Sequence, residues 1–452
     1  MRHFFPILLL FLCSNLMAQT NVQGIISSNQ VWTASNSPYI ITQNTLLDSG
    51  VSLDIRPGTI VQSNGSFRFI IDGELIVNGN KDSLVVMDKM KFEFNKECKE
   101  YNFSNNTGSH FNFTWFKGDN TGGTNTIKLT DVSLLITNSR FTNCYYAIYA
   151  YSSMYDTSKI KVLKTVFESD NGYGSPTSVS GSNVFLEMDE CQIYNMCNMY
   201  VPANFRFTRS LINKMTCYSG IRIMGGNRLA KANTYIACNV FKNFKANVFE
   251  AFYLDTNTSV NIIDNTFDSA DVFLTIYAGD INNTFTSVVS GNNFLTAKIY
   301  DVKFVGTSQS AGQFIRFDMT DNYWGSSDTA LIKAGIYDFQ DDITSCYKVD
   351  YSSFLSSNNN ACGAQFLSVN AVSDSKFNIF PNPASDMVQV RFENSTIRTI
   401  SLFNAFGVKV KELHSDNETV SFSCKDLSAG VYILNIKEES GRLMSGKLLI
   451  AH

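Results

Sequence analysis

The sequence predicts an all-β chain, with a right-handed parallel β-helix solenoid followed by a small C-terminal β-sandwich of the immunoglobulin-like kind. One observation is a repeated pattern in which an asparagine stands two residues before a large aromatic residue, at Asn239, Asn265, Asn292 and Asn322. The steps are 26, 27 and 30 residues (265−239, 292−265, 322−292), with no helical pattern between them. A fixed period of this size is typical of a solenoid. The second observation is a change of pattern after residue 376.

Asparagine has physical reasons to recur at one position of a solenoid. It tolerates the left-handed backbone conformation at a tight bend, and stacked amides can hydrogen-bond from rung to rung. We therefore expect a structural ladder at one corner, with the following aromatic side chains stacked inside. The register continues towards the N-terminus through large side chains that each have a small residue two positions before them, namely Phe141, Phe167, Ile193 and Ile212. By spacing it extends further, to Phe116 and Phe92.

The chain divides into four predicted segments. Residues 1–18 have a basic start and an apolar stretch too short to span a bilayer, which indicates a signal peptide cleaved after Ala18. Residues 19–355 are the predicted solenoid, in which the Gly- and Ser-rich segment 169–182 is expected to be a loop that leaves the coil. Residues 356–376 form a polar linker, and residues 377–452 contain several short alternating strands. No later stretch is long and apolar enough to be a transmembrane helix.

Charge and cysteine content limit the partners. The net charge of −4 with only 17% charged residues gives no basic surface for nucleic acid. Ten cysteines, nine after the predicted signal peptide, leave at least one free thiol. Cys197 and Cys217 can face each other on neighbouring rungs, and Cys346 and Cys362 can close the end of the solenoid. We favour Cys191 and Cys238 as small buried residues, and no cysteine or histidine spacing indicates a metal site.

Two segments of the solenoid resemble a known class of proteins. The run from Leu53 to Thr59 with Ile71 to Leu75 resembles the start of secreted bacterial right-handed β-helix proteins of the pectin-lyase-like class. Asn322 to Gly325, followed by Ile336 to Asp338, resembles the way in which their repeat arrays end. The resemblance covers about residues 25–355 and implies the fold. That class includes polysaccharide lyases, hydrolases, epimerases and non-catalytic adhesins, so it implies no single activity.

Residues 377–452 resemble the type A C-terminal sorting domain of the type IX secretion system of Bacteroidetes. The residues that carry the resemblance are Pro381, Asn382, Pro383 and Ala384, the turn that ends at Gly407, and the run that contains Gly430 and Tyr432. The resemblance implies recognition by the outer-membrane translocon, then processing by its sortase and release or anchoring at the cell surface. The family often ends in a basic residue such as lysine, whereas this chain ends in His452.

Several charged residues are candidates for chemistry. Lys164, Glu190 and Arg209 alternate in sign on consecutive rungs, as either a charged cleft for an acidic glycan or a salt-bridge ladder, and we favour the ladder. A lyase could hold Ca²⁺ with a carboxylate cluster beside an arginine base, and the best available group is Glu187, Asp189, Glu190, Arg206 and Arg209. Glu187 over Arg206 would instead be a second ion pair.

A second candidate pair is Asp264 and Asp321, which lie two rungs apart, or about 9.5 Å along the backbone. Two carboxylates at such a separation can serve an inverting glycosidase. An aspartate before an asparagine at a bend is also a common turn residue, which is the interpretation we favour. His110 is the one histidine of the predicted solenoid, so a Ser-His-Asp arrangement would depend on it.

Tyr145, Tyr149 and Tyr151 share one predicted strand face and could stack on sugar rings, although tyrosine is also common on ordinary sheet surfaces. Since no convincing catalytic group emerges, we interpret the chain as an exported, non-catalytic glycan-binding or adhesive protein at the cell surface or released. The alternative is a polysaccharide lyase or a glycoside hydrolase, and a third hypothesis is a structural surface-layer component. No cofactor is expected, and Ca²⁺ is expected only for a lyase.

Overall fold

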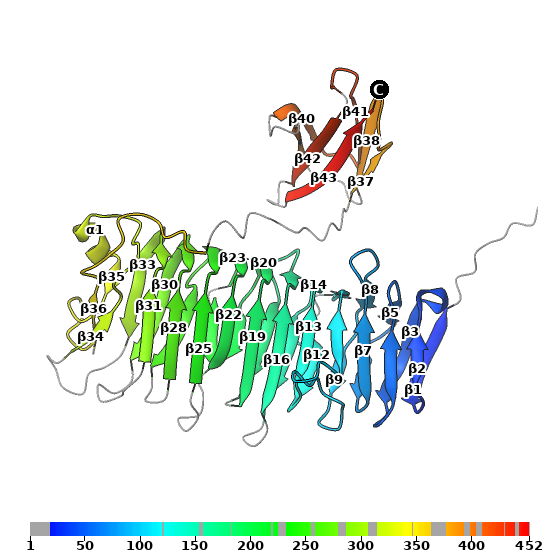
Figure 1. Ribbon diagram of the computed structural model, residues 1–452, viewed down its shortest axis with the longest axis horizontal. Helices are drawn as coiled ribbons and strands as arrows, with labels where there is room; N and C mark the ends of the chain where they lie inside the picture. The colour runs from blue at the N-terminus through cyan, green and yellow to red at the C-terminus, as the bar shows by residue number, and fades with distance from the viewer. Residues whose placement is uncertain are drawn as a thin grey trace, which may run out of the picture. The chain divides into compact units, whose positions relative to one another are not determined.

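Short strands joined by tight corners make up nearly all of the chain (Figure 1). The structure, a computed structural model, divides into two compact units, residues 1–367 and 368–452. It describes residues 19–119, 122–152, 157–181, 183–217, 220–224, 232–254, 258–278, 286–305, 314–345, 347–362, 377–392, 398–403, 409–428, 430–438 and 443–451. The predicted signal peptide lies outside these residues.

The first unit is a parallel β-helix with three stacks of strands, which confirms the predicted solenoid. Sheet 1 has 11 parallel strands: β2 (Gln30–Trp32), β4 (Ser52–Ile55), β7 (Glu74–Asn78), β10 (His110–Asn112), β13 (Leu134–Thr137), β16 (Ser158–Leu163), β19 (Val184–Asp189), β22 (Asn204–Thr208), β25 (Ala232–Ala237), β28 (Thr258–Ile263) and β31 (Thr286–Ser290).

Sheet 2 follows sheet 1 in each turn of the coil. Its strands are β5 (Ile60–Ser63), β8 (Val85–Asp88), β11 (Thr114–Lys117), β14 (Arg140–Thr142), β17 (Val166–Glu168), β20 (Gln192–Met196), β23 (Leu211–Met215), β26 (Val240–Phe244), β29 (Thr266–Asp268) and β32 (Asn293–Phe294). Sheet 3 completes the turn with β6 (Phe69–Ile71), β9 (Phe92–Phe94), β12 (Asn125–Thr130), β15 (Tyr146–Tyr151), β18 (Ser175–Ser180), β21 (Met199–Pro202), β24 (Ile221–Met224), β27 (Phe249–Leu254), β30 (Ala270–Ala278), β33 (Ala297–Val305) and β35 (Ile336–Tyr337).

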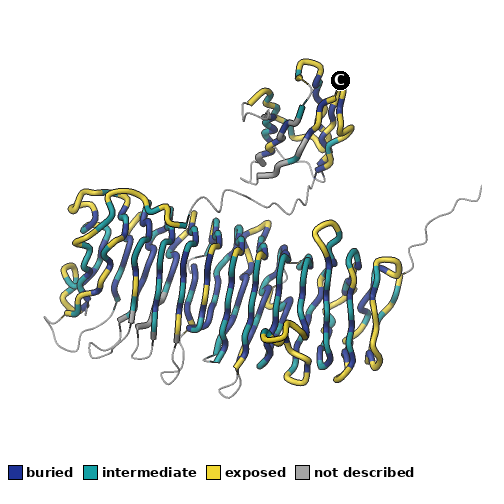
Figure 2. The backbone as a smooth tube through the Cα atoms, viewed as in Figure 1, coloured by how far each residue is buried: buried dark blue, intermediate teal, exposed yellow. Residues whose placement is uncertain are grey.

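Sheets 2 and 3 are joined at the N-terminal end of the coil. There β1 (Thr20–Ile26) pairs with β3 (Tyr39–Leu47), and β3 pairs with both β5 and β6. A 3₁₀ turn, Ala34–Asn36, lies between β2 and β3. Along most strands buried residues alternate with partly exposed ones (Figure 2), as in the strict alternation of β19. Each rung therefore sends every second side chain into one continuous core.

The aromatic residues of the repeat stack inside sheet 2, as predicted. Phe116, Phe141 and Phe167 pair in register, and their rings are stacked at centroid distances of 4.3 and 4.9 Å. A second stack runs through Phe241, Phe267, Phe294 and Trp324 at 4.9, 5.2 and 4.9 Å. The extension to Phe92 is wrong. Met87 stands opposite Phe116, and Phe92 belongs to sheet 3.

The four asparagines form a buried hydrogen-bonded ladder at the corner between sheets 1 and 2. The side-chain oxygens of Asn265, Asn292 and Asn322 each accept the backbone N–H of the asparagine one rung earlier at 2.9 Å, and that of Asn239 accepts the N–H of Ser210. Each side-chain NH₂ donates to a backbone carbonyl, as from Asn265 to Ile236 at 2.9 Å. The rung-to-rung bonding is confirmed.

The expected reason for asparagine at this corner is only half right. The left-handed conformation belongs to the residue before each asparagine, with φ of 57° at Cys238, 55° at Asp264, 71° at Gly291 and 58° at Asp321. The same column is left-handed on earlier rungs, at Asn138, Lys164, Glu190 and Arg209. The asparagines are therefore selected by their hydrogen bonds and not by their backbone conformation.

The C-terminal end of the coil contains α1 (Thr329–Ala334), β34 (Ile315–Asp318) and β36 (Tyr347–Asp350), with β34 and β36 paired in parallel. The Asp328 carboxylate caps α1 by accepting the N–H of Ala330 at 2.9 Å. After β36, residues 351–362 form a strap that runs back along the corner between sheets 1 and 2 (Figure 1). The backbone N–H of Asp321 donates to the Ser353 carbonyl of the strap, and the Leu355 N–H of the strap donates to the Asn322 carbonyl.

The strap ends three rungs back from the last asparagine, on the rung of Asn239. Asn359 bonds to Asp264, Gly291 and Asn293, and Cys362 forms a disulfide with Cys238. The predicted pairing of Cys362 with Cys346 is therefore wrong, as is Cys238 as an unpaired residue, because the strap folds back past three rungs. Cys346 lies outside the described residues.

Two other cysteine predictions are confirmed. Cys197 and Cys217 form a disulfide between neighbouring rungs, with their Cα atoms 4.8 Å apart. Cys191 is a free, buried thiol. The segment 169–182 is a loop only in part, since residues 175–180 form β18 of sheet 3.

The second unit consists of two small antiparallel sheets with a shared core, as predicted. One sheet contains β37 (Phe377–Phe380), β38 (Met387–Phe392) and β41 (Thr419–Ser423). The other contains β40 (Lys409–Ser415), β39 (Arg398–Phe403), β42 (Gly430–Glu438) and β43 (Leu443–Ile450). Fully buried Val388 and Val390 of the first sheet lie in one apolar cluster with Leu434 and Leu448 of the second.

We predict that Asn265→Ala lowers the free energy of unfolding of the chain lacking residues 1–18 by roughly 3 kcal/mol. The substitution leaves the buried N–H of Asn239 and the carbonyl of Ile236 without their partners, and a buried unpaired polar group costs about 1–3 kcal/mol. Urea denaturation followed by circular dichroism measures the effect. Asn233→Ala, at an exposed position of β25, is the matched control, and equal losses from both variants would contradict the proposed role of the ladder.

Candidate functional site

The alternating charges on consecutive rungs are paired with one another. The Lys164 ammonium lies 3.8 Å from the Glu190 carboxylate, which lies 3.3 Å from the Arg209 guanidinium. Arg209 also binds Asp189, with its Nε 2.9 Å from a carboxylate oxygen. Burial acts to raise the pKa of Asp189, but hydrogen bonds from Arg209 and Thr208 outweigh it and hold that pKa below its ordinary value. The geometry is that of the salt-bridge ladder.

The expected ion pair between Glu187 and Arg206 is wrong, because each side chain has another partner. The two residues are opposite each other in β19 and β22. However, the Glu187 carboxylate lies 2.8 Å from the ammonium of Lys161, one rung earlier. The Arg206 guanidinium stacks over the ring of Tyr235, with its carbon 4.6 Å from the ring centroid. Each carboxylate of the proposed calcium cluster is thus engaged by a cation, which opposes the binding of another cation there.

Asp264 is covered by the strap. Its carboxylate accepts a hydrogen bond of 2.7 Å from the Asn359 side chain. A Cβ at Gly291, on the next rung, would lie 2.0 Å from the same carboxylate oxygen, so no larger residue fits between Asp264 and the rung of Asp321. Asp321 is exposed. Both aspartates occupy the left-handed corner position directly before an asparagine of the ladder.

One group of potential metal ligands occurs among the residues that the structure describes. Cys238, Asp264 and Cys362 place one ligand atom each within 4.8 Å of one another. The two sulfur atoms are bonded to each other as a disulfide, so neither is available as a thiolate ligand.

The tyrosines that contact one another are not the three that the sequence predicts. Tyr145, Tyr146 and Tyr149 cluster, with ring centroids 4.7 and 6.4 Å apart. Ala147 and Ile148 are both buried, which breaks the strand alternation and brings Tyr146 to the side of Tyr149. Tyr151, at 51% exposure, stands apart from this tyrosine cluster.

Tyr200 extends the tyrosine cluster along the solenoid. It pairs with Ser178, which pairs with Tyr149, so the two tyrosines stand two rungs apart in one column of sheet 3. The Asn198 side chain donates a hydrogen bond of 3.1 Å to the Tyr200 hydroxyl. Burial raises the pKa of Tyr146, with smaller contributions from Tyr145, Tyr200 and Tyr149. Sequence reasoning missed Tyr146 and Tyr200, because strict alternation excludes the first and the pairing register is needed for the second.

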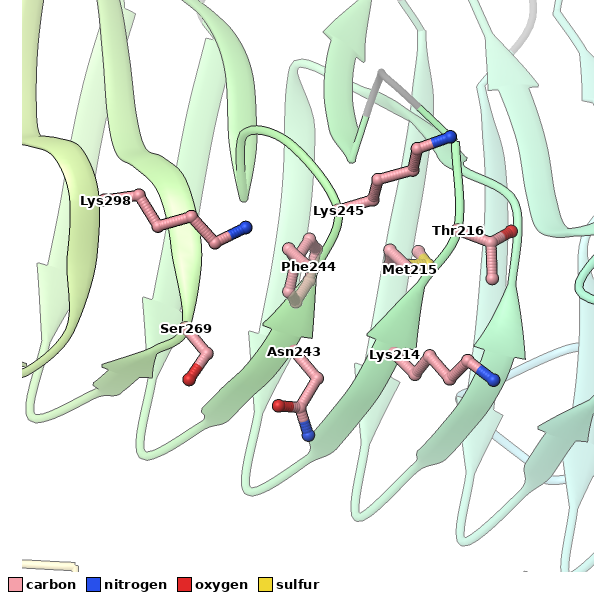
Figure 3. Close-up of a pocket in the computed structure, with 8 residues that line it drawn as sticks. All are labelled: Lys214, Met215, Thr216, Asn243, Phe244, Lys245, Ser269 and Lys298. Carbon is pink, nitrogen blue, oxygen red and sulfur yellow. The ribbon is translucent and has the colours of Figure 1, made fainter. Parts of the chain in front are cut away.

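A hollow of about 460 Å³ lies at the corner between sheets 2 and 3 (Figure 3). It is lined by Lys214, Met215, Thr216, Asn243, Phe244, Lys245, Ser269 and Lys298. Sequence reasoning missed this lysine groove. The sequence does contain a signal that could have predicted the groove. Its lysines follow the aligned large residues Ile212, Phe241 and Phe294 by two or four positions.

The residues of the predicted sorting motif hold the last strand of the second unit. Asn382 accepts the N–H of Leu449 at 2.8 Å, and buried Ala384 donates its N–H to the Leu449 carbonyl at 2.9 Å. The Tyr432 hydroxyl donates to the carbonyl of Ser428 at 2.9 Å, which closes the turn before β42. Pro381 and Pro383 are exposed beside Asn382, Gly430 begins β42, and Gly407 lies outside the described residues.

Residues 378–451 match a family described as the secretion system C-terminal sorting domain. The second unit is a type IX secretion sorting domain. It confirms the predicted export, which ends at the cell surface or in the extracellular space. In the described parts of the chain, no helix has the length and apolar character to cross a membrane.

Comparison with solved structures finds a periplasmic alginate epimerase, at 10% sequence identity and a TM-score of 0.33. The match covers 70% of this chain and 77% of the epimerase chain. Comparison with curated protein sequences finds no match.

His110 and Asp301 are two further ionisable residues of the solenoid. His110 bonds through Nδ1 to the carbonyl of Gly108 at 2.8 Å and through Nε2 to the side chain of Asn78 at 3.2 Å. Asp301, only 8% exposed, lies against Gly335 at the end of α1. Burial raises the pKa of the Asp301 carboxyl from 3.8 to about 7.

We predict that Asp301→Asn stabilises the protein at pH 8 but not at pH 4. The folded protein keeps a proton on Asp301 that the unfolded chain releases above pH 3.8, so stability falls as pH rises from 3.8 to about 7. Removing the charge should raise the free energy of unfolding at pH 8 by up to about 4 kcal/mol. Urea denaturation from pH 4 to 8 measures this, with exposed Asp82→Asn as the control. A difference from the parent chain that is independent of pH would contradict the assignment.

Proposed function

We propose that this protein is an exported, non-catalytic glycan-binding protein that carries its ligand on the outer surface of the solenoid. The tyrosine cluster on sheet 3 carries the proposal. The Tyr146 ring contacts the Tyr145 ring edge-on and the Tyr149 ring at a tilt, and Tyr200 lies two rungs along from Tyr149. Aromatic rings present an apolar face beside a polar hydroxyl, which suits the mixed character of a sugar ring.

The surroundings of the candidate carboxylates support binding over catalysis. Glu187, Asp189 and Glu190 are each within ion-pair distance of a lysine or arginine, and Asp264 is bonded to the strap. A general acid for glycoside hydrolysis needs a raised pKa, whereas the pKa of Asp189 is lowered. Sheet 3, which does not contain these carboxylates, offers a fixed and repetitive surface. A rigid surface loses little conformational entropy when it binds a ligand.

The binding hypothesis predicts that the protein is retained on at least one polysaccharide without cleaving it. The double variant Tyr145→Ala, Tyr149→Ala should weaken retention by roughly tenfold or more, because stacking surface on two rings is lost. Affinity electrophoresis on plant, algal and host polysaccharides measures retention, while reducing ends and unsaturated uronide absorbance report cleavage.

Tyr151→Ala, which removes an exposed tyrosine outside the tyrosine cluster, is the matched control and should leave retention unchanged. Cleavage of any of these polysaccharides by the parent chain would favour a lyase or a hydrolase. Absence of both retention and cleavage would contradict glycan binding and favour a structural or protein-adhesive role.

We predict that a chain ending at residue 376 stays in the periplasm, because the translocon reads the sorting domain that it lacks. Protease protection of intact cells, followed by fractionation and immunoblotting, measures the location. Resistance of the periplasmic fragment to limited proteolysis shows that the solenoid is folded. Delivery of this truncated chain to the cell surface would contradict dependence on the sorting domain.

A further inference from the structure

The corner between sheets 2 and 3 forms a continuous track along the solenoid. Backbone bonds join its successive rungs, from Ser175 to Tyr145, from Cys197 to Gly174 and from Cys217 to Cys197. The next rungs continue through the lysine groove, where Lys245 donates its N–H to the carbonyl of Met215. The tyrosine cluster begins at one end of this track, and Lys298 marks the other. Six rung steps separate Tyr145 from Lys298, or about 29 Å.

The lysine groove has the charge of an anion site. Three lysines from different rungs, Lys214, Lys245 and Lys298, line it (Figure 3). All three are exposed, and none of the eight lining residues is acidic. Lys298 lies 3.2 Å from a carboxylate oxygen of Asp271. Lys214 forms no ion pair with any residue that the structure describes, so at least one cation remains available.

The walls of the lysine groove suit a hydroxylated ligand. Thr216, Asn243 and Ser269 supply hydroxyl and amide groups, while buried Phe244 and Met215 form its floor. Such a combination of a few polar groups over an apolar base is typical of a ligand site. The chain as a whole carries a net charge of −4, so this basic surface is a local feature and not part of a general positive field.

We propose that the lysine groove binds the carboxylate or sulfate groups of an acidic polysaccharide that lies along this corner. The inference rests on the proposed glycan binding and specifies its ligand class. Lysine ammonium groups pair with both kinds of anion as point charges, so the groove recognises charge spacing along a chain. The tyrosine cluster stacks on sugar rings, and the lysine groove neutralises acidic groups further along the same polymer.

The segment between the two sites belongs to the same surface. The loop at residues 170–174 reaches two rungs along, where the Gly172 carbonyl accepts a hydrogen bond of 2.5 Å from the Thr216 hydroxyl. Tyr173, at 61% exposure, stands on this loop and adds an aromatic ring between the two sites. The disulfide of Cys197 and Cys217 fixes the rungs beneath the loop.

The test uses the full chain without residues 1–18 and three polysaccharides: a polyuronate, a sulfated galactan and a neutral glucan. The double variant Lys214→Gln, Lys298→Gln should bind the acidic polymers about tenfold more weakly, since each exposed charge contributes modestly. The loss of affinity of the parent chain with rising salt should be smaller in this variant. Lys242→Gln, which removes an exposed lysine of β26 outside the groove, is the matched control and should bind like the parent chain.

The outcomes separate the two proposals. Preference for the polyuronate identifies carboxylate as the bound group, and preference for the sulfated galactan identifies sulfate. Equal binding of neutral and acidic polymers, unchanged in the lysine double variant, would overturn the groove assignment while leaving glycan binding intact. Failure of the parent chain to bind any polysaccharide would overturn glycan binding itself. Equal losses in the lysine double variant and in Lys242→Gln would show a nonspecific charge effect and would also overturn the groove assignment.

Discussion

The buried asparagine ladder is the constraint on which the C-terminal half of the solenoid depends. The corner between sheets 1 and 2 is so tight that one residue per rung takes a left-handed conformation, and backbone N–H and carbonyl groups there turn into the core. Asn239, Asn265 and Asn292 satisfy those groups and also bond to one another. On earlier rungs Ser210 has the same role, with its hydroxyl accepting the N–H of Cys191. Register is thereby fixed along the whole corner.

The strap covers the last rungs of the corner between sheets 1 and 2. There the Asn359 side chain donates hydrogen bonds to the Asp264 carboxylate and to the Gly291 carbonyl. Asn359 contacts two successive rungs, through Asp264 on one and through Gly291 and Asn293 on the next, and the disulfide from Cys362 to Cys238 anchors the end of the strap beside the ladder. Tyr351 and Phe354 of the strap also pack against the apolar core, with the Tyr351 ring against Trp324 at the end of the aromatic stack. The glycan binding that we propose uses sheet 3 and the corner between sheets 2 and 3.

The tyrosine cluster and the lysine groove illustrate how a solenoid brings together residues that are distant in sequence. Tyr149 and Tyr200 stand two rungs apart in one column of sheet 3, although 51 residues (200−149) separate them in sequence. Lys214, Lys245 and Lys298 line one groove for the same reason. No local pattern marks such sets, because loops of different lengths change the sequence spacing while the rung spacing stays constant.

The sequence by itself determined the solenoid, the asparagine ladder, the stacked aromatic core, the Cys197–Cys217 bridge and the sorting domain. Each of these repeats at a fixed period or rests on a local motif, so side-chain chemistry and spacing suffice to predict it. Only the tertiary structure decided that Phe92 belongs to another sheet, that Cys362 reaches Cys238, that Tyr146 joins the tyrosine cluster and that Glu187 pairs with Lys161. These features depend on how each rung is registered against its neighbours and on a strap that reverses direction, and neither is encoded in any single stretch of sequence.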